Sequence, residues 1–120
     1  MKCAESFMLE ITETKTPPLI TLELKGRMDA ITSDQLDGTI SILIDQKESQ
    51  FVIDFSQLEY ISSSGLRVLL IAAKKLKNAD GQLVLCSLND QIKTIFDISG
   101  FSSIFSIVQS RKEALNRLES

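Results

Sequence analysis

The sequence predicts an α/β domain built on one mixed, mostly parallel β-sheet with helices packed against it. Strand-like and helix-like segments alternate in the order β-β-α-β-α-β-α-β-α along the 120 residues. Two of the strand segments, 51–55 and 83–86, are nearly continuous apolar runs, as strands covered on both faces of a parallel sheet usually are. The length is that of one ordinary domain, so we expect residues 1–120 to share one core.

The first two strands are expected to form an antiparallel pair. Apolar and polar residues alternate over 7–11 and again over 20–24, which is the pattern of half-buried strands. Between them, the sequence Thr16-Pro17-Pro18 interrupts the first strand and leaves a link short enough for the two strands to run antiparallel. Gly26 is expected to end the second strand.

Two helices follow in the first two-thirds of the chain. Thr32 and Gln35 have the spacing of a capping box, and apolar residues recur at helical spacing after them. A second helix is predicted to begin at Ser63 or Ser64 and to end at 78–81. Its apolar residues cover a wide arc of the helix, so much of it is expected to be buried.

The C-terminal third has its own start and stop signals. Asn89 is expected to cap a third helix, and Gly100 is expected to end it. A short last strand is predicted within 104–108. Ser110 and Glu113 have the spacing of a second capping box, which predicts a final helix.

The composition argues against an enzyme. Hydrophobic residues at 43% and charged residues at 24% are ordinary values for a globular protein. The absence of histidine removes the usual general base, the Ser-His and Cys-His nucleophile pairs and most zinc sites. No nucleophile elbow and no glycine-rich phosphate loop is present. We therefore expect no catalytic residues, no metal and no cofactor, and a protein that works by binding other proteins.

Charge and hydropathy predict a cytoplasmic protein. The net charge is −3, and the lysines at 74–77 suit the end of a predicted helix better than a surface for nucleic acid. The first residues lack the apolar segment of a signal peptide, and no apolar stretch is long enough to span a bilayer. Cys3 and Cys86 form no C-x-x-C pair, which fits a reducing compartment. We expect neither membrane insertion nor direct contact with nucleic acid.

One segment has a pattern that suggests function. Ser62, Ser63 and Ser64 follow a predicted strand and open a predicted helix, at the strand end where open α/β sheets meet ligands and partners. A serine there can cap the helix by satisfying a free amide. The helix start can also bind a phosphate-containing ligand, or a serine can itself be phosphorylated. The residues alone leave these three interpretations open.

The surrounding sequence resembles a known family. The segment from Asp54 to Leu70 resembles the signature of the STAS family, the domain of bacterial anti-sigma factor antagonists and of sulfate-transporter tails. The stretch 26–30 is similar to the family's Gly-x-Leu-Asp motif, and 89–101 to its third-helix motif. The resemblance covers nearly the whole chain in order, and it implies one STAS-like domain over residues 1–120.

The resemblance also implies a mechanism. In antagonists of this family, the unphosphorylated domain binds an anti-sigma factor that is also a serine kinase, and so frees a sigma factor. The first serine after the family's aspartate is the phosphoacceptor, and Ser63 stands at that position. Phosphorylation ends the binding, and a metal-dependent serine phosphatase reverses it. The expected partner-binding surface consists of Met28, Asp29, Ala30, Ile31, Ser62, Ser63, Ser64 and Arg67.

Three points stay open at this stage. Ser62 stands where the family usually has aspartate, which adds a competing hydroxyl beside Ser63. Ser64, beside Gly65, is the better candidate for capping the helix or for supporting the neighbouring Ser63. Met28 and Ile31 have the alternative role of stapling the first helix. Two other functions stay open: a non-catalytic subunit that braces a transporter ATPase, and a sensor that binds a nucleotide or phosphate at the same helix end.

Overall fold

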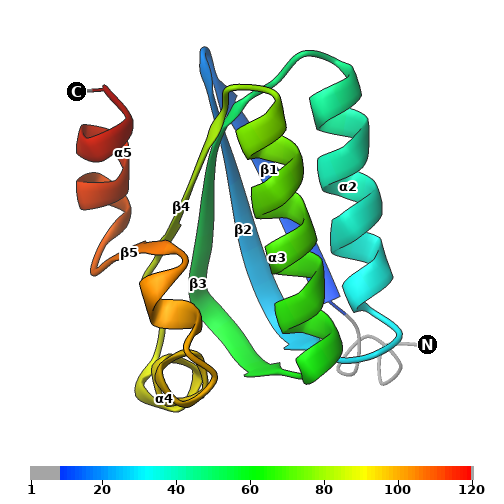
Figure 1. The fold of residues 1–120 in the computed structure, drawn as a ribbon, viewed down its shortest axis with the longest axis vertical. Coiled ribbons are helices and arrows are strands. Elements are labelled where there is room, and N and C mark those ends of the chain that lie inside the picture. The colour runs from blue at the N-terminus through cyan, green and yellow to red at the C-terminus, as the bar shows by residue number, and fades with distance from the viewer. Residues whose placement is uncertain (1–8, 120) are drawn as a thin grey trace.

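The computed structural model describes residues 9–119, which form a five-stranded sheet in the order β1-β2-β3-β4-β5 (Figure 1). β1 and β2 pair antiparallel, and every later neighbour in the sheet pairs parallel. The strands are β1 (Leu9–Thr16), β2 (Leu19–Met28), β3 (Gln50–Ile61), β4 (Gln82–Cys86) and β5 (Ser106–Val108). The predicted mixed, mostly parallel sheet is therefore confirmed, although position 7 of the first predicted strand lies outside the described residues.

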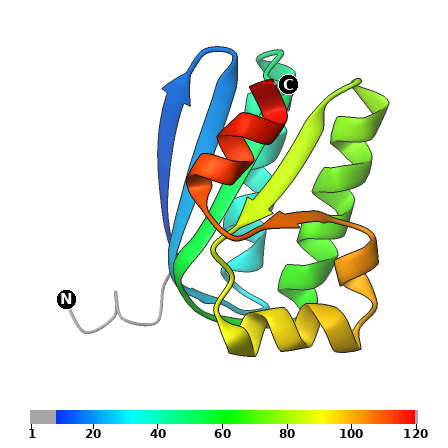
Figure 2. The same ribbon diagram turned by 90° about the vertical axis from the view of Figure 1, so that its left-hand side faces the viewer.

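Helices cover both faces of this sheet. α2 (Ser33–Asp45) and α3 (Ser63–Asn78) lie side by side on one face, and α5 (Arg111–Glu119) lies on the other face, against β3 and β4 (Figures 1 and 2). α4 (Asp90–Ile98) lies near the end of the sheet where β2 and β3 finish, and the short 3-10 turn η1 (Phe101–Ser103) lies between α4 and β5. Among residues 9–119, no helix combines the length and hydropathy needed to cross a membrane.

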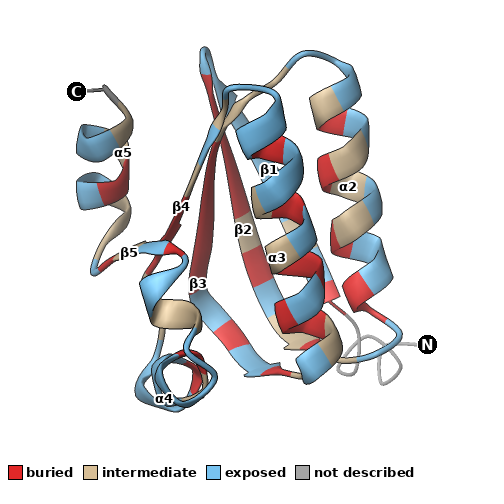
Figure 3. Cartoon of the chain, in the orientation of Figure 1, coloured by how far each residue is buried: buried red, intermediate tan, exposed pale blue. Residues whose placement is uncertain are grey.

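Burial is two-sided because alternate residues of the central strands point to opposite faces. Phe51, Ile53 and Phe55 of β3 belong to the large buried core, which they share with residues of α2, α3 and α4. Figure 3 shows how burial is distributed along the strands and helices. Val52 of β3 joins a smaller core beneath α5, formed by Val52, Val84, Cys86, Val108 and Ala114. The apolar run at 51–55 is therefore explained by cover on both faces, as the sequence predicted.

Several predicted boundaries need correction. β2 does not end at Gly26, whose φ of 110° and the register shift beside it allow the strand to continue to Met28. β3 also extends well beyond the apolar run, to Ile61. The predicted last strand is shorter than expected, because 104 and 105 lie outside β5.

The predicted helix caps fall into two groups. Asn89 accepts a hydrogen bond from the N–H of Ile92 at 2.9 Å, and the Ser110 hydroxyl accepts one from the N–H of Glu113 at 3.2 Å, so both start signals are confirmed. The predicted capping box of Thr32 and Gln35 is wrong. Within residues 9–119, Thr32 at the N-cap of α2 makes no side-chain capping hydrogen bond, and the Gln35 amide instead donates to the carbonyl oxygen of Leu9 at 2.8 Å.

Candidate functional site

The three serines lie in the turn that joins β3 to α3. Ser62 is the N-cap of α3: its backbone is extended, and its hydroxyl accepts a hydrogen bond from the N–H of Gly65 at 3.2 Å. Its own N–H donates to the carbonyl oxygen of Met28 at 2.8 Å, which ties the serine turn to the end of β2. The expectation that Ser64 caps the helix is therefore wrong, because Ser62 occupies the only position before the helix from which a side chain reaches that amide.

Ser63 is the first residue of α3 and its side chain is exposed, whereas Ser62 and Ser64 are half-buried. The predicted placement of Ser63 at a helix start near a strand end is confirmed. The first turn of α3 holds no acidic residue, and helix geometry leaves the first amides of the turn without intrahelical acceptors. The surroundings of the Ser63 hydroxyl are therefore favourable to a negative charge.

The loop between β2 and α2 is organised by one carboxylate. Oδ1 of Asp29 accepts hydrogen bonds from the N–H of Ile31 at 3.0 Å and from the N–H of Thr32 at 2.9 Å. The N–H of Asp29 in turn donates to the Thr32 hydroxyl at 2.9 Å. The hydrogen bond from the Thr32 N–H lowers the pKa of Asp29, with smaller contributions from the Ile31 N–H and the charge of Arg27. Asp29 thus holds the loop in shape, so its reversal would disturb the loop itself.

The neighbouring apolar residues differ sharply in exposure. The Ile31 side chain is 83% exposed, so it does not staple α2, whereas Met28 is 0% exposed. Met28 packs beneath Gly65, since a Cβ atom on that glycine would lie 3.1 Å from the Met28 Cγ. The expectation that Met28 contacts a partner is therefore corrected: its side chain belongs to the core. Ala30 and Arg67 are exposed.

The structure brings the remaining predicted residues to one end of the molecule. The loop after β2 and the first turn of α3 both lie at the end where β2 and β3 finish, the lower end of Figure 1. The hydrogen bond from Ser62 to Met28 joins these two segments directly. The exposed members of this set, which we call the serine face, are Ala30, Ile31, Ser63 and Arg67, with the half-buried Asp29, Ser62 and Ser64 beside them.

Sequence reasoning missed an aromatic element close to this face. The Arg27 guanidinium lies over the Tyr60 ring, 4.5 Å from its centroid, at adjacent register positions of β2 and β3. Tyr60 is 38% exposed and lines a groove together with Glu59, Gln91, Ile92, Thr94 and Ile95. The stacking occupies Arg27 and keeps it close to the ring. A pairing of this kind depends on strand register, so no local pattern indicated it.

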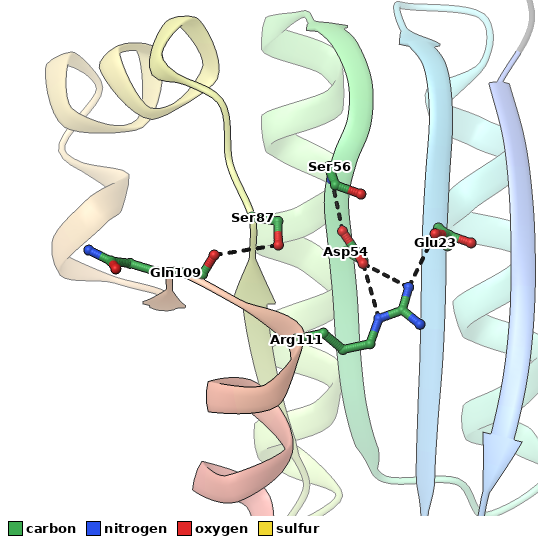
Figure 4. Close-up of polar contacts among 6 residues, drawn as sticks. All are labelled: Glu23, Asp54, Ser56, Ser87, Gln109 and Arg111. Carbon is green, nitrogen blue, oxygen red and sulfur yellow. Dashed lines mark hydrogen bonds and ion pairs between the residues drawn. The ribbon is translucent and has the colours of Figure 1, made fainter.

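Sequence reasoning also missed a polar cluster on the face of the sheet that α5 covers, opposite α2 and α3 (Figure 4). Arg111, the first residue of α5, donates to Oδ2 of Asp54 from Nε at 3.0 Å and from Nη2 at 2.7 Å. The same Nη2 lies 3.2 Å from Oε2 of Glu23, and Oδ1 of Asp54 accepts from the N–H of Ser56 at 2.8 Å. Asp54 is buried and fully engaged, so this cluster attaches α5 to the sheet and is separate from the serine face.

Comparison with known proteins supports a family assignment. The sequence profile of the STAS domain family matches residues 10–114. BtrV of Bordetella bronchiseptica, a protein named as an anti-sigma factor antagonist, is 38% identical over 106 residues, which cover 88% of this chain and 91% of BtrV. The mixed sheet with helices on both faces is the fold of one class of α/β domain, the STAS domain. The chain belongs to the STAS domain family, as the resemblance predicted.

Several solved structures share this fold, and two of them illustrate the likeness. An anti-sigma factor antagonist from Mycobacterium paratuberculosis superposes with a TM-score of 0.85 at 19% identity, covering 93% of this chain and 95% of that one. The Bacillus cell fate determinant SpoIIAA in its phosphorylated form gives a TM-score of 0.71 at 22% identity, covering 92% of this chain and 98% of that one. At these identities the likeness concerns the fold.

Proposed function

We propose that this chain is an anti-sigma factor antagonist. It binds an anti-sigma factor that is also a serine kinase, and so releases a sigma factor for transcription. The similarity to BtrV supports the first part. The observation that carries the proposed switch is the exposure of Ser63 at the start of α3, while Ser62 is engaged as the cap and Ser64 is half-buried.

Phosphorylation of Ser63 is the proposed off-switch. The Ser63 hydroxyl oxygen forms a bond to the γ-phosphorus of ATP held by the kinase, the bond to the bridging oxygen breaks, and ADP leaves. The hydroxyl proton passes to a base of the kinase. The product carries a charge of about −1.5 to −2 at neutral pH. A serine phosphatase of the metal-dependent class restores the hydroxyl by hydrolysis.

The proposed contact surface is the serine face. Ile31 is its apolar anchor, because a large and almost fully exposed side chain on an ordered loop suits a pocket of a partner. A phosphate forced unpaired into such a closed interface costs roughly 3 kcal/mol, which weakens binding over a hundredfold. The modification therefore releases the partner by a local change of charge, and the domain itself need not unfold.

The switch is tested with the anti-sigma factor kinase itself. The chain is incubated with that kinase and ATP, and the modified peptide is mapped by mass spectrometry, alongside binding assays of Ser63→Ala and Ser63→Glu. We expect the phosphate on Ser63. Ser63→Ala is expected to bind the anti-sigma factor kinase as tightly as the parent does, and Ser63→Glu is expected to bind it weakly. Phosphate on Ser62 alone would assign the phosphorylation site to Ser62 instead. Binding of Ser63→Glu to the kinase as tightly as the parent would contradict the proposed off-switch.

The contact surface needs a separate test. Arg67→Glu is expected to weaken partner binding with little change in melting temperature, because the Arg67 side chain is exposed. Lys74→Glu, an equal charge change at an exposed position farther along α3, serves as the matched control. Asp29 is unsuitable for this purpose, since its carboxylate holds the loop. If Arg67→Glu, Lys74→Glu and the parent all bound the partner equally well, the serine face would not be the contact surface.

One observation favours a second function. Ser62 replaces the acidic residue that usually precedes the acceptor in the family, and here it serves as a neutral cap. A domain that is not phosphorylated would fit a non-catalytic subunit bracing a transporter ATPase, or a sensor for nucleotide or phosphate. A pull-down from native lysate separates these functions by recovering an anti-sigma factor kinase, a transporter ATPase or no protein. In each case we expect no hydrolase, transferase or redox turnover from the purified chain.

A further inference from the structure

Arg67 lies one helical turn after Ser63 on the same exposed side of α3. Both residues are exposed and stand four positions apart, a spacing that places side chains next to each other on a helix surface. Their Cα atoms are separated by about 6 Å along the helix axis, which a guanidinium group spans easily. Among residues 9–119, Arg67 forms no ion pair, so its charge is uncommitted in the unmodified protein.

Other cations near this end of the molecule are less suitable. Arg27 lies over the Tyr60 ring, 4.5 Å from its centroid. On α3 itself, Lys75 pairs with Asp37 and donates to the Ser41 hydroxyl, far from the start of the helix. Arg67 is the only cationic residue in the first two turns of α3. The first turn of α3 has no acidic residue that would compete with a phosphate for the Arg67 guanidinium.

We propose that Arg67 is an internal receptor for the phosphate on Ser63. The guanidinium pairs with the phosphate oxygens across one turn of α3, in the same chain. An anionic residue four positions before a cationic one is the favourable order on a helix, and a guanidinium donates two parallel hydrogen bonds to a phosphate. The inference rests on the proposed function, because it takes Ser63 as the residue that carries the phosphate.

This pairing changes how the switch works. Phosphorylation then has two effects on the serine face: it adds negative charge at Ser63, and it withdraws the Arg67 cation from any acidic group of the partner. It also stabilises the first turn of α3, since the phosphate interacts with both the helix start and the side chain one turn later. The modified domain is therefore expected to be more stable than the unmodified one.

The experiment places phosphoserine at position 63 of the full chain during translation, so that no kinase is needed. Phosphorus NMR then follows the second ionisation of the phosphate in the parent, Arg67→Gln, Arg67→Lys and Lys74→Gln backgrounds. A cation beside the phosphate favours the dianion and lowers its pKa. We expect a midpoint at least about 0.3 pH units lower in the parent than in Arg67→Gln, with Lys74→Gln matching the parent. Arg67→Lys is expected to retain part of the difference.

A second readout follows the receptor itself. The Nε–H resonance of Arg67 is expected to shift when Ser63 is phosphorylated, and the same resonance of Arg27 is expected to stay. Equal phosphate midpoints in the parent and Arg67→Gln would overturn the proposal, as would an equal change caused by Lys74→Gln. These results are independent of the experiment in which the kinase phosphorylates the chain. The NMR titration can show no pairing with Arg67 although the kinase phosphorylates Ser63. Conversely, the installed phosphate can pair with Arg67 although the kinase does not phosphorylate Ser63.

Discussion

Ser62, Ser63 and Ser64 are chemically identical, and their positions relative to the start of α3 give them different surroundings. Ser62 is the last extended residue, so its side chain turns back to the N–H of Gly65. Ser63 is the first helical residue and is exposed. The aspartate that the family usually has at position 62 is also a good N-cap. The serine at position 62 therefore keeps the cap and lacks the negative charge that an aspartate would place beside Ser63, the proposed acceptor.

Removing the Ser62 hydroxyl is expected to lower the stability of the domain, whereas removing the exposed Ser63 hydroxyl is not. Ser62→Ala loses the hydrogen bond to the Gly65 N–H and is expected to lower the free energy of unfolding by about 1 kcal/mol. Ser62→Asp is expected to match or exceed the parent, because a carboxylate caps the helix and suits its dipole. Ser63→Ala serves as the control and should change the free energy of unfolding by less than about 0.5 kcal/mol. Urea unfolding measures all three, and equal effects at 62 and 63 would contradict the assignment of the cap.

At the scale of elements, the contact between α3 and the ends of β2 and β3 is unusually close. A Cβ atom at Gly65 would lie 2.8 Å from Cγ1 of Ile61 and 3.1 Å from Cγ of Met28, both in buried side chains. The glycine thus lets the first turn of α3 approach the sheet. Gly38 in α2 is different, because a Cβ atom there would meet no atom of the described part of the chain within 4 Å.

The two glycines offer a matched comparison. Gly38→Ala is expected to raise the free energy of unfolding by about 0.5–1 kcal/mol, since alanine is the better helix former and has room. Gly65→Ala gains the same propensity but forces buried side chains apart, at a cost of about 1–3 kcal/mol. We expect net destabilisation at 65 and net stabilisation at 38 in thermal or urea unfolding. A stabilised Gly65→Ala variant would show that the contact is looser than the structure indicates.

The attachment of α5 depends on Arg111 and Asp54. The Asp54 side chain is 7% exposed and that of Arg111 is 40% exposed, so the pair is only partly screened by solvent. Arg111→Met leaves a buried carboxylate with the Ser56 N–H as its remaining partner and is expected to cost about 1–2 kcal/mol, less than a fully buried pair. Glu23→Gln is the milder control. Hydrogen exchange should show faster opening of α5 in Arg111→Met, and unchanged protection of α5 would contradict this role.

At the scale of the whole molecule, helices pack on both faces of the sheet. Cys86 lies in the smaller core, so its reactivity measures how well α5 covers that core. Its side chain is 0% exposed beneath α5. Burial, helped by the negative charge of Asp54, raises the pKa of the Cys86 thiol to about 11. The folded state therefore favours the neutral thiol. This contribution to stability is complete below the unfolded thiol pKa, about 8.5, and is lost as the pH rises from there toward about 11.

Cys86 should consequently react with thiol reagents only when the domain opens. In a Cys3→Ser background at pH 8, labelling of the native protein is expected to follow the opening of the α5 face, and labelling in urea is expected to be fast. Arg111→Met should speed the native reaction if α5 covers the thiol. Labelling of the native parent at the rate seen in urea would contradict the burial of Cys86.

Much of the architecture could be predicted because it rests on local patterns. The apolar runs at 51–55 and 83–86 indicated buried parallel strands, and both lie in the centre of the sheet. The caps at Asn89 and Ser110 were found because a cap and its amide lie within one turn of each other. The start of α3 at Ser63 followed from the same kind of signal.

By itself, then, the sequence determined the order of the elements, the mixed sheet and the position of Ser63 at a helix start. The tertiary structure decided the contacts between distant segments. Arg111 meets Asp54 across 57 residues, and the burial of Met28 depends on how α3 docks over the end of β2. Local patterns extend over about one helical turn or a few strand positions, whereas such contacts depend on strand register and helix docking, which arise only when the whole chain packs.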